Sequence, residues 1–208
     1  MSHAKILDAI VPYEFRNLPY KKVLDCGCGR GIWGYIMRVE LRDDRAYIVG
    51  VDIARECLYF CKRNNVYDDL ILADVSKLPF RSNAFELTLA SEVIEHLNKK
   101  QGIDFLDQIE YITTNELILT TPNGYWPQKR VTGAERHISE WRAKDFTKRG
   151  YKVYGVGLKG FDPERVPHML SILMRFVFTP ISYLLPYLGE LLVAIKIKRA
   201  QGHNFFGD

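Results

Sequence analysis

The stretch that decides the fold is VLDCGCGRGIWG, which runs from Val23 to Gly34. It opens as a short apolar run that ends in an acid, Asp25, and the glycine-rich turn Gly27 to Gly31 follows at once. Glycines permit positive φ and let a ligand lie against bare backbone. A helix that begins after them offers unpaired N–H groups and partial positive charge. The stretch therefore predicts a strand, a ligand-binding turn and a helix.

Outward from this stretch, β-branched runs of strand length alternate with amphipathic segments of helix length. Strands joined by helices run parallel and are buried on both faces. The last two apolar runs have no such helix pattern, so we expect them to pair antiparallel at one edge. The fold class is α/β: a doubly wound, mostly parallel seven-stranded sheet, Rossmann-like, with an antiparallel last strand and a helical insert before it. The predicted strands are Lys22–Cys26, Tyr47–Asp52, Leu70–Ala73, Phe85–Ala90, Glu116–Thr121, Tyr151–Gly157 and Glu190–Arg199, and the predicted helices are Gly31–Leu41, Ala54–Asn64 and Lys100–Thr113.

The chain has 208 residues, of which 47% are apolar and 26% charged, and these values exclude a disordered or collagen-like chain. We expect one domain over 1–208, with an N-terminal helix at 3–16 and an apolar helical insert at 166–189. The insert is interrupted by Arg175, Pro180 and Pro186, whereas a membrane span needs about 20 uninterrupted apolar residues. It is expected to cover a pocket, with contact to a membrane surface as the alternative.

Charge is unevenly divided along the chain. Residues 1–128 carry a net charge of −3 and residues 129–208 a net charge of +7. A basic half of this kind can attract an anionic substrate, nucleic acid or an acidic membrane surface. The four cysteines lack metal-ligand spacing and are expected to be reduced thiols. With no signal-peptide pattern at the start, we expect a cytoplasmic location, with membrane association left open.

Acids end three successive predicted strands: Asp25, Asp52 and Asp74. In a parallel sheet all three ends meet at the carboxyl edge, where ligands bind. Asp52 can accept hydrogen bonds from both hydroxyls of a ribose. Residues 29–34 also match the dinucleotide pattern G-x-G-x-x-G. However, a pyrophosphate gains nothing from the Asp25 carboxylate, whereas a ligand with an ammonium group gains a partner.

At these residues the sequence resembles the class I S-adenosylmethionine-dependent methyltransferases, from about Lys21 to Gly157. The likeness includes SEVIEHL, Ser91 to Leu97, a run similar to those of the small-molecule and quinone-precursor branch. It implies S-adenosyl-L-methionine as the cofactor. The cofactor-binding residues that it implies are Asp25, Cys26, Gly27, Cys28, Gly29, Gly31 and Ser91 for the methionine end, Asp52 for the ribose, and Ile53, Asp74 and Val75 for the adenine.

The resemblance also implies an enzyme that transfers a methyl group by in-line displacement. A hydroxyl acceptor would have to lose a proton, and the candidate bases are Glu95, His96 and His137. His96 and His137 are the predicted catalytic or acceptor-facing residues, and a structural role for each histidine is the alternative. Tyr125 and Trp126 could stack on a flat acceptor or belong to the core.

Absent motifs narrow the acceptor. The sequence has no Asp-Pro-Pro-Tyr-like run for adenine amino groups, no Pro-Cys loop for pyrimidine carbon, and no metal-ligand pattern, so no metal is expected. A small-molecule or lipid-like acceptor remains, because the apolar insert could form a lid and Lys159, Arg165 and Arg175 could meet an anionic head group. The alternatives are RNA bound through the basic half, an NAD-binding oxidoreductase, and a non-catalytic binding module.

Overall fold

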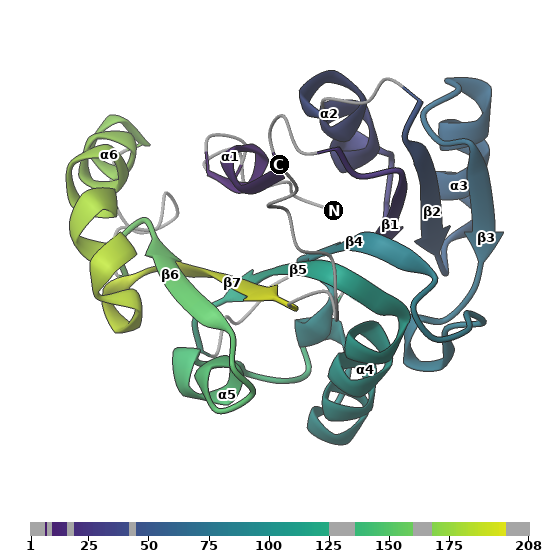
Figure 1. Cartoon of the computed structure of the whole chain (residues 1–208). Coiled ribbons are helices and arrows are strands. Elements are labelled where there is room, and N and C mark those ends of the chain that lie inside the picture. The colour runs from purple at the N-terminus through teal and green to yellow at the C-terminus, as the bar shows by residue number, and fades with distance from the viewer. Residues whose placement is uncertain are drawn as a thin grey trace, which may run out of the picture.

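The computed structural model describes residues 7, 10–15, 19–41, 45–124, 136–159 and 168–198. A single seven-stranded sheet with strand order β3-β2-β1-β4-β5-β7-β6 runs through the molecule, and helices lie on both of its faces (Figure 1). The strands are β1 Lys22–Cys26, β2 Tyr47–Asp52, β3 Asp69–Leu72, β4 Phe85–Ser91, β5 Thr113–Pro122, β6 Lys152–Val156 and β7 Leu191–Ile197. The helices are α1 Val11–Phe15, α2 Ile32–Glu40, α3 Arg55–Arg63, α4 Lys99–Ile112, α5 Ala143–Thr147 and α6 His168–Leu184.

The pairing of the strands confirms the predicted fold class. β1 lies parallel to β2 and β4, β2 is parallel to β3, and β4 is parallel to β5. β7 inserts between β5 and β6 and runs antiparallel to both. The strand order runs outward from β1 to β3 in one direction and from β4 onward in the other, so it reverses between β1 and β4. Open α/β sheets bind their ligands in the crevice at such a switch point.

Neighbouring residues of each strand supply two separate cores, one on each face of the sheet. Val23 packs with α1, α2 and α3, in a cluster that includes Trp33. Leu24, the next residue, packs on the opposite face with Phe105 of α4 and Phe146 of α5. Figure 1 shows α1 and α2 above the sheet and α4 and α5 below it. A strand buried on both faces reads as a continuous apolar run, and for this reason the parallel strands were recognisable in the sequence.

Some elements differ from the prediction. α5 occupies a stretch that we expected to be a loop, because its five residues are too few to carry a helical period. The described N-terminal helix is α1, Val11–Phe15, and much of the predicted 3–16 helix lies outside the described residues. β5 begins at Thr113, directly after α4 and before the predicted start at Glu116.

The described part of the apolar insert is α6 and a short 3₁₀ helix, Pro186–Leu188. α6 packs on the edge strand β6, where the Tyr154 and Tyr183 rings stack with centroids 4.1 Å apart and Ser182 Oγ donates to the Gly155 carbonyl at 3.3 Å (Figure 1). Of the helices that the structure describes, none combines the length and apolar character needed to cross a membrane.

Gly102 of α4 packs closely against Trp141, which lies in the same loop as His137. A Cβ atom on Gly102 would overlap the ring of Trp141, which is buried. In an exposed helix, replacing glycine by alanine stabilises by about 1 kcal/mol. Here we expect Gly102→Ala to lower the free energy of unfolding by about 1–3 kcal/mol, since the ring must move.

Urea unfolding followed by circular dichroism measures this change. Lys100→Ala, an exposed position of the same helix, is the matched control and should change stability by less than about 0.5 kcal/mol. Equal stability of Gly102→Ala and wild type would contradict the tight contact.

Candidate active site at the carboxyl edge

The glycine turn after β1 adopts the backbone conformation that the sequence predicts. Gly27, Gly29 and Gly31 have φ values of 73°, 51° and 84°, in the left-handed region. A Cβ atom on Gly27 would also overlap the side chain of Val93. The N–H groups of Gly27 and Cys28 both donate to the Val51 carbonyl, at 2.8 and 2.9 Å. The turn is therefore fixed against the end of β2, next to the strand-order switch.

Asp25 is fully buried behind this turn. Its Oδ2 accepts a hydrogen bond from the Tyr67 hydroxyl at 2.6 Å, while Oδ1 has no hydrogen-bond partner among the described residues. Burial, with a smaller contribution from the nearby Asp52 charge, raises the pKa of Asp25 to about 7, and the Tyr67 hydrogen bond opposes the shift. A buried carboxylate with one unsatisfied oxygen is suited to bind a cationic group.

Tyr67 is a site residue that the sequence analysis missed. Its hydroxyl accepts a hydrogen bond from the Gly34 N–H at 3.2 Å and donates to Asp25, so it connects the first turn of α2 to the β1 acid. Tyr67 follows α3 in a polar stretch, and the sequence around it does not indicate that its hydroxyl will contact Asp25. A Cβ atom on Gly34 would overlap the Tyr67 ring. A glycine within a helix is therefore a local sign in the sequence that another group packs closely there.

Asp52 ends β2 at the same edge and is 4% exposed. Its two oxygens accept hydrogen bonds from the N–H groups of Gly29 at 2.7 Å and Ala54 at 2.8 Å. Each carboxylate oxygen has a second lone pair, so Asp52 can still accept from the two hydroxyls of a ribose. Its position beside the glycine turn fits the predicted role.

The adenine side of the predicted site is more exposed. The Ile53 side chain is 57% exposed, an apolar surface that a flat ring could cover. Asp74 is exposed and accepts from the Ser76 N–H at 2.8 Å, and it thereby caps the 3₁₀ helix Val75–Lys77. The capping role of Asp74 is observed, while the adenine-binding roles of Ile53, Asp74 and Val75 stay predictions.

Hydroxyl groups of β5 hold the acids that follow β4. Thr120 Oγ1 lies 2.8 Å from Ser91 Oγ and donates to Glu92 Oε1 at 3.0 Å. Thr121 Oγ1 donates to Glu95 Oε2 at 3.0 Å, while Glu95 Oε1 has no hydrogen-bond partner within the described part of the chain. The ends of β4 and β5 thus present two carboxylates beside the predicted methionine side of the site.

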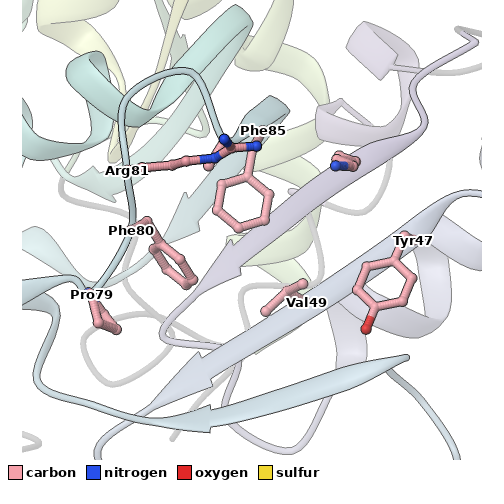
Figure 2. Close-up of a pocket in the computed structure, with 8 residues that line it drawn as sticks. Tyr47, Val49, Pro79, Phe80, Arg81 and Phe85 are labelled. Atoms are coloured by element: carbon pink, nitrogen blue, oxygen red, sulfur yellow. The ribbon is translucent and has the colours of Figure 1, made fainter.

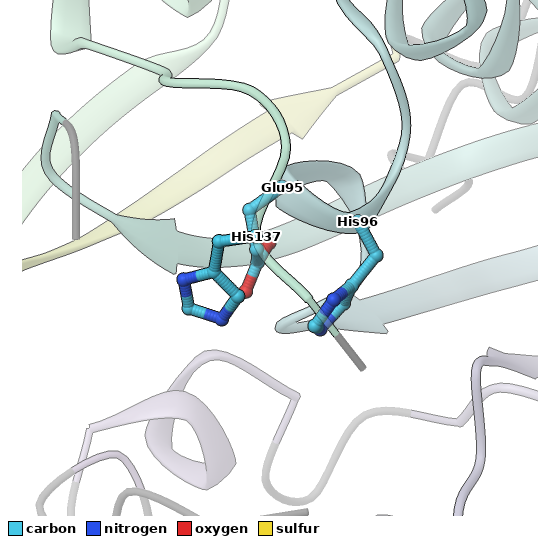
Figure 3. A group of neighbouring side chains, drawn as sticks. All are labelled: Glu95, His96 and His137. Carbon is cyan, nitrogen blue, oxygen red and sulfur yellow. The ribbon is translucent and has the colours of Figure 1, made fainter. Parts of the chain in front are cut away.

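Glu95 also lies beside the two predicted acceptor-facing histidines (Figure 3). One potential ligand atom from each of Glu95, His96 and His137 lies within 4.8 Å of the other two. The histidine rings meet edge to face with centroids 4.9 Å apart, and His96 Nδ1 lies 3.2 Å from the Arg136 carbonyl oxygen. The structure therefore brings together three residues that the sequence analysis named as candidate bases but did not group.

Two carboxyl groups with raised pKa values lie in this part of the site. Burial raises the pKa of Glu92 to about 7, the Glu190 charge adds to the shift, and the Thr120 hydrogen bond opposes it. Burial likewise raises the pKa of Glu95, and the Glu92 charge raises it further. Negative charge on Glu92 thus disfavours a second negative charge on Glu95. A cation would be stabilised here.

Asn123, at the end of β5, links three parts of the chain around this cluster. Its side-chain Nδ2 donates to the carbonyls of Pro186 and Gly189, both at 2.8 Å, and its backbone N–H donates to the Glu190 carbonyl at 2.9 Å. It also pairs with Trp141, four residues beyond His137. The end of the apolar insert is thus attached to the acceptor side of the site. Tyr125, Trp126 and Arg165 lie outside the described residues, as does the side chain of Arg175.

A pocket of about 460 Å³ lies at the opposite edge of the sheet (Figure 2). Lys22, Tyr47 and Phe85, which line it, are the first residues of β1, β2 and β4. Ligands of open α/β sheets bind at the carboxyl ends of the strands. We therefore assign the site to the glycine turn and the acids rather than to this pocket.

Comparison with known proteins agrees with this geometry. Residues 23–115 match the family model described as a methyltransferase domain. Over these 93 of its 208 residues the chain is similar to a methyltransferase domain. The match ends at Asn115, within β5, and so covers the glycine turn and the acids that end β1 and β2. The cofactor of the class I family is S-adenosylmethionine. The sub-branch suggested by SEVIEHL stays a prediction.

Two curated relatives and one solved structure illustrate the range of similar proteins. A malonyl-[acyl-carrier protein] O-methyltransferase of Legionella pneumophila is 29% identical over 58% of this chain and 44% of its own length. The human mitochondrial arginine-hydroxylase NDUFAF5 is 33% identical over 47% of this chain and 26% of its own. An S-adenosylmethionine-dependent methyltransferase of Archaeoglobus fulgidus superimposes with a TM-score of 0.62 at 16% identity, over 95% of each chain. The match thus spans less than half of either curated relative.

The residues present fit S-adenosylmethionine. The unsatisfied Oδ1 of buried Asp25 can take the ammonium group of the methionine end. The positive-φ turn of Gly27, Gly29 and Gly31 leaves backbone bare for close approach, and Asp52 lies beside this turn, where it can accept from ribose hydroxyls.

The buried charge of Asp25 predicts how stability depends on pH. Because the folded pKa is about 7 against an ordinary value of 3.8, the folded chain holds the proton more tightly, and its stability falls as pH rises from about 4 through 7. Asp25→Asn removes the charge. We expect this variant to be more stable than wild type by about 1–3 kcal/mol at pH 8 and to match it at pH 4.

Urea unfolding at both pH values measures the difference. Asp69→Asn, at an exposed position at the amino end of β3, is the control. The difference in free energy of unfolding between this variant and wild type should be about the same at pH 4 and pH 8. A stability gain from Asp25→Asn that is the same at pH 4 and pH 8 would contradict the assignment.

Proposed function

We propose that this chain transfers a methyl group from S-adenosylmethionine to a small-molecule or lipid-like acceptor. The observation that carries the proposal is the alignment of two groups of residues along one sheet edge. Asp25, Asp52 and the glycine turn lie at the ends of β1 and β2, and Glu95, His96 and His137 lie beyond the ends of β4 and β5. One group suits a cationic, sugar-bearing donor, and the other suits an acceptor.

When bound, the donor supplies a methyl group on a sulfonium, which transfers by in-line displacement. The chain's contribution is to bind both partners, align them and exclude water. Asp25 and Asp52 hold the two ends of the donor through charge and hydrogen bonds. Ser91, between the two groups, borders the methionine side.

His96 and His137 are the residues proposed to face the acceptor. Each imidazole can take up a proton near neutral pH, which a hydroxyl acceptor must lose. Thr121 orients Glu95, which lies between the histidines and the sheet. The buried carboxylates around the histidines favour any positive charge that forms there.

An apolar face of α6 supports a lipid-like acceptor or a membrane contact. Leu173, Val177 and Ile181 recur every four residues, and all three are exposed, as are Leu170 and Leu184 at the ends of the series. Asn123 attaches the end of the same insert to the acceptor side of the site. The relative named for methylating a malonyl group on a carrier protein agrees with a small acyl acceptor.

The ribose assignment gives a direct test of donor binding. Asp52→Asn keeps the shape of the side chain but removes its charge and one acceptor oxygen. We expect the dissociation constant for S-adenosylmethionine to rise about 10- to 100-fold, since buried hydrogen bonds to charged groups contribute about 1.5–3 kcal/mol.

Isothermal titration with the donor and with S-adenosylhomocysteine measures this loss, and thermal unfolding checks the fold of the variant. Asp69→Asn, at the opposite end of the neighbouring strand, should bind both compounds like wild type. Unchanged affinity in a folded Asp52→Asn protein would refute the assignment of Asp52 to the ribose.

The acceptor class can be read from the fate of the methyl group. Wild type is incubated with methyl-labelled donor and cell extract, and label is then measured in the lipid, small-molecule, RNA and protein fractions. We expect label in the lipid or small-molecule fraction and its loss in Asp52→Asn.

Label in RNA or protein alone would overturn the proposed acceptor while leaving methyl transfer intact. Donor binding with no label in any fraction would favour the non-catalytic module, and binding of a nicotinamide cofactor instead of the donor would favour the oxidoreductase.

A further inference from the structure

We propose that Glu95, His96 and His137 form a binding site for a divalent transition-metal ion at the carboxyl ends of β4 and β5. Two imidazoles and one carboxylate are the donor set of metal sites that use three protein ligands and keep further positions open. His96 and His137 belong to separate segments, the 3₁₀ helix Ile94–His96 and the loop before α5. Folding brings the three residues together (Figure 3).

The distances suit a single ion. One ligand atom of each side chain lies within 4.8 Å of the other two. Atoms that bind the same ion at about 2.1 Å lie roughly 3 to 4.2 Å apart. The 4.8 Å limit exceeds this range by about 0.6 Å, a difference that small side-chain rotations can close.

Glu95 supplies a second, independent indication of a cation. The residue is only 2% exposed, and its Oε1 has no hydrogen-bond partner among the described residues, whereas Thr121 holds Oε2 at 3.0 Å. Figure 3 places the Glu95 carboxylate beside the His137 ring. Leaving a buried carboxylate oxygen unsatisfied is costly, and a bound cation would remove that cost.

The surroundings of His96 match those of a metal-binding histidine. Its Nδ1 lies 3.2 Å from the Arg136 carbonyl, which can only accept a hydrogen bond, so Nδ1 carries the proton. In the neutral ring Nε2 is then the basic nitrogen, and metal-bound histidines commonly donate the other N–H to a carbonyl in this way. The Glu95 carbonyl also accepts from the N–H groups of Ile138 at 2.9 Å and Ser139 at 3.1 Å, which fixes the His137 segment.

The donor set selects the class of ion. Imidazole ligands suit Zn²⁺, Fe²⁺, Ni²⁺ and Cu²⁺, and the carboxylate of Glu95 also suits Mn²⁺, while Mg²⁺ and Ca²⁺ prefer sites built from oxygen alone. The half-buried Glu92 carboxylate, held by Thr120, adds negative charge next to Glu95. We therefore expect Mn²⁺ or Zn²⁺ to bind more tightly than Mg²⁺.

One consequence rests on the proposed function. A hydroxyl of the acceptor on an open position of the ion would lose its proton to solvent more readily, because a bound cation lowers the pKa of a ligand hydroxyl. The resulting alkoxide forms the new O–CH₃ bond as the C–S bond breaks, and the bonding pair stays on sulfur as a neutral thioether. His96 and His137 then act as ligands and not as bases.

Metal binding is tested on the full chain without donor or acceptor. The protein is treated with a chelator, dialysed against Mn²⁺, Zn²⁺ or Mg²⁺, and bound metal is counted by elemental analysis, with Mn²⁺ affinity followed by paramagnetic resonance. We expect about one Mn²⁺ or Zn²⁺ per chain, and affinity at least 10-fold lower in His96→Ala, His137→Ala and Glu95→Gln.

Asp104→Asn, an exposed carboxylate on α4, is the matched control and should bind metal like wild type. Circular dichroism and thermal unfolding check that each variant is folded. His137→Gln replaces His137→Ala if that variant fails to fold. No bound metal in wild type, or equal affinity in the folded histidine variants, would overturn the site.

Failure of the two proposals is distinguishable. Metal binding that depends on these residues, in a protein that transfers no methyl group, would support the metal site and refute the methyl-transfer proposal. Full methyl transfer by the metal-free protein would overturn the catalytic consequence. In metal-free protein, donor affinity is expected to be the same in His137→Ala and wild type, because Asp25 and Asp52 bind the donor at the ends of other strands.

Discussion

The rest of the site depends on the burial of carboxylates along the carboxyl edge of the sheet. Asp25 and Glu95 are almost inaccessible to solvent, and each has an oxygen without a hydrogen-bond partner in the described part of the chain. Their observed donors, Tyr67 and Thr121, are neutral hydroxyls. Folding must therefore bear a desolvation penalty that hydrogen bonds only partly offset. A cationic ligand at either carboxylate would remove part of this cost, as we propose for the donor at Asp25 and for a metal ion at Glu95.

The parallel sheet explains why these groups lie side by side. The alternation of strands and helices brings the carboxyl ends of β1, β2, β4 and β5 to one edge. A donor between β1 and β2 and an acceptor beyond β4 and β5 are then adjacent through the topology alone. The antiparallel β7 extends the sheet beyond β5, and Asn123, which follows β5, donates hydrogen bonds to the end of the apolar insert just before β7. In the proposed site, the strand order thus sets the donor beside β1 and β2 and the acceptor beside β4 and β5.

Most of the fold and the donor half of the site could be predicted because their signals are local in sequence. β1 and β2 have the predicted ends, and the glycine turn and the acid next to it occupy a dozen consecutive residues. Tyr67 could not be predicted, because its contact with Asp25 depends on how α3 packs. The grouping of Glu95 and His96 with His137 likewise depends on the tertiary fold, since forty residues separate His96 from Arg136. A spacing rule for metal ligands finds only ligands that are close in sequence.

The two cationic partners should influence each other through the same edge. The positive charge of a sulfonium donor next to Ser91 would oppose a second cation near Glu95, unless the acids between them stay ionised. Glu92 lies between these positions, with its carboxylate held by Thr120, which also contacts Ser91. An ionised Glu92 can offset part of the charge on either side and so allow both partners to bind together. The hydroxyl groups that connect β4 to β5 thus couple the donor half of the site to the acceptor half, and a sheet with only apolar residues at these positions could not do so.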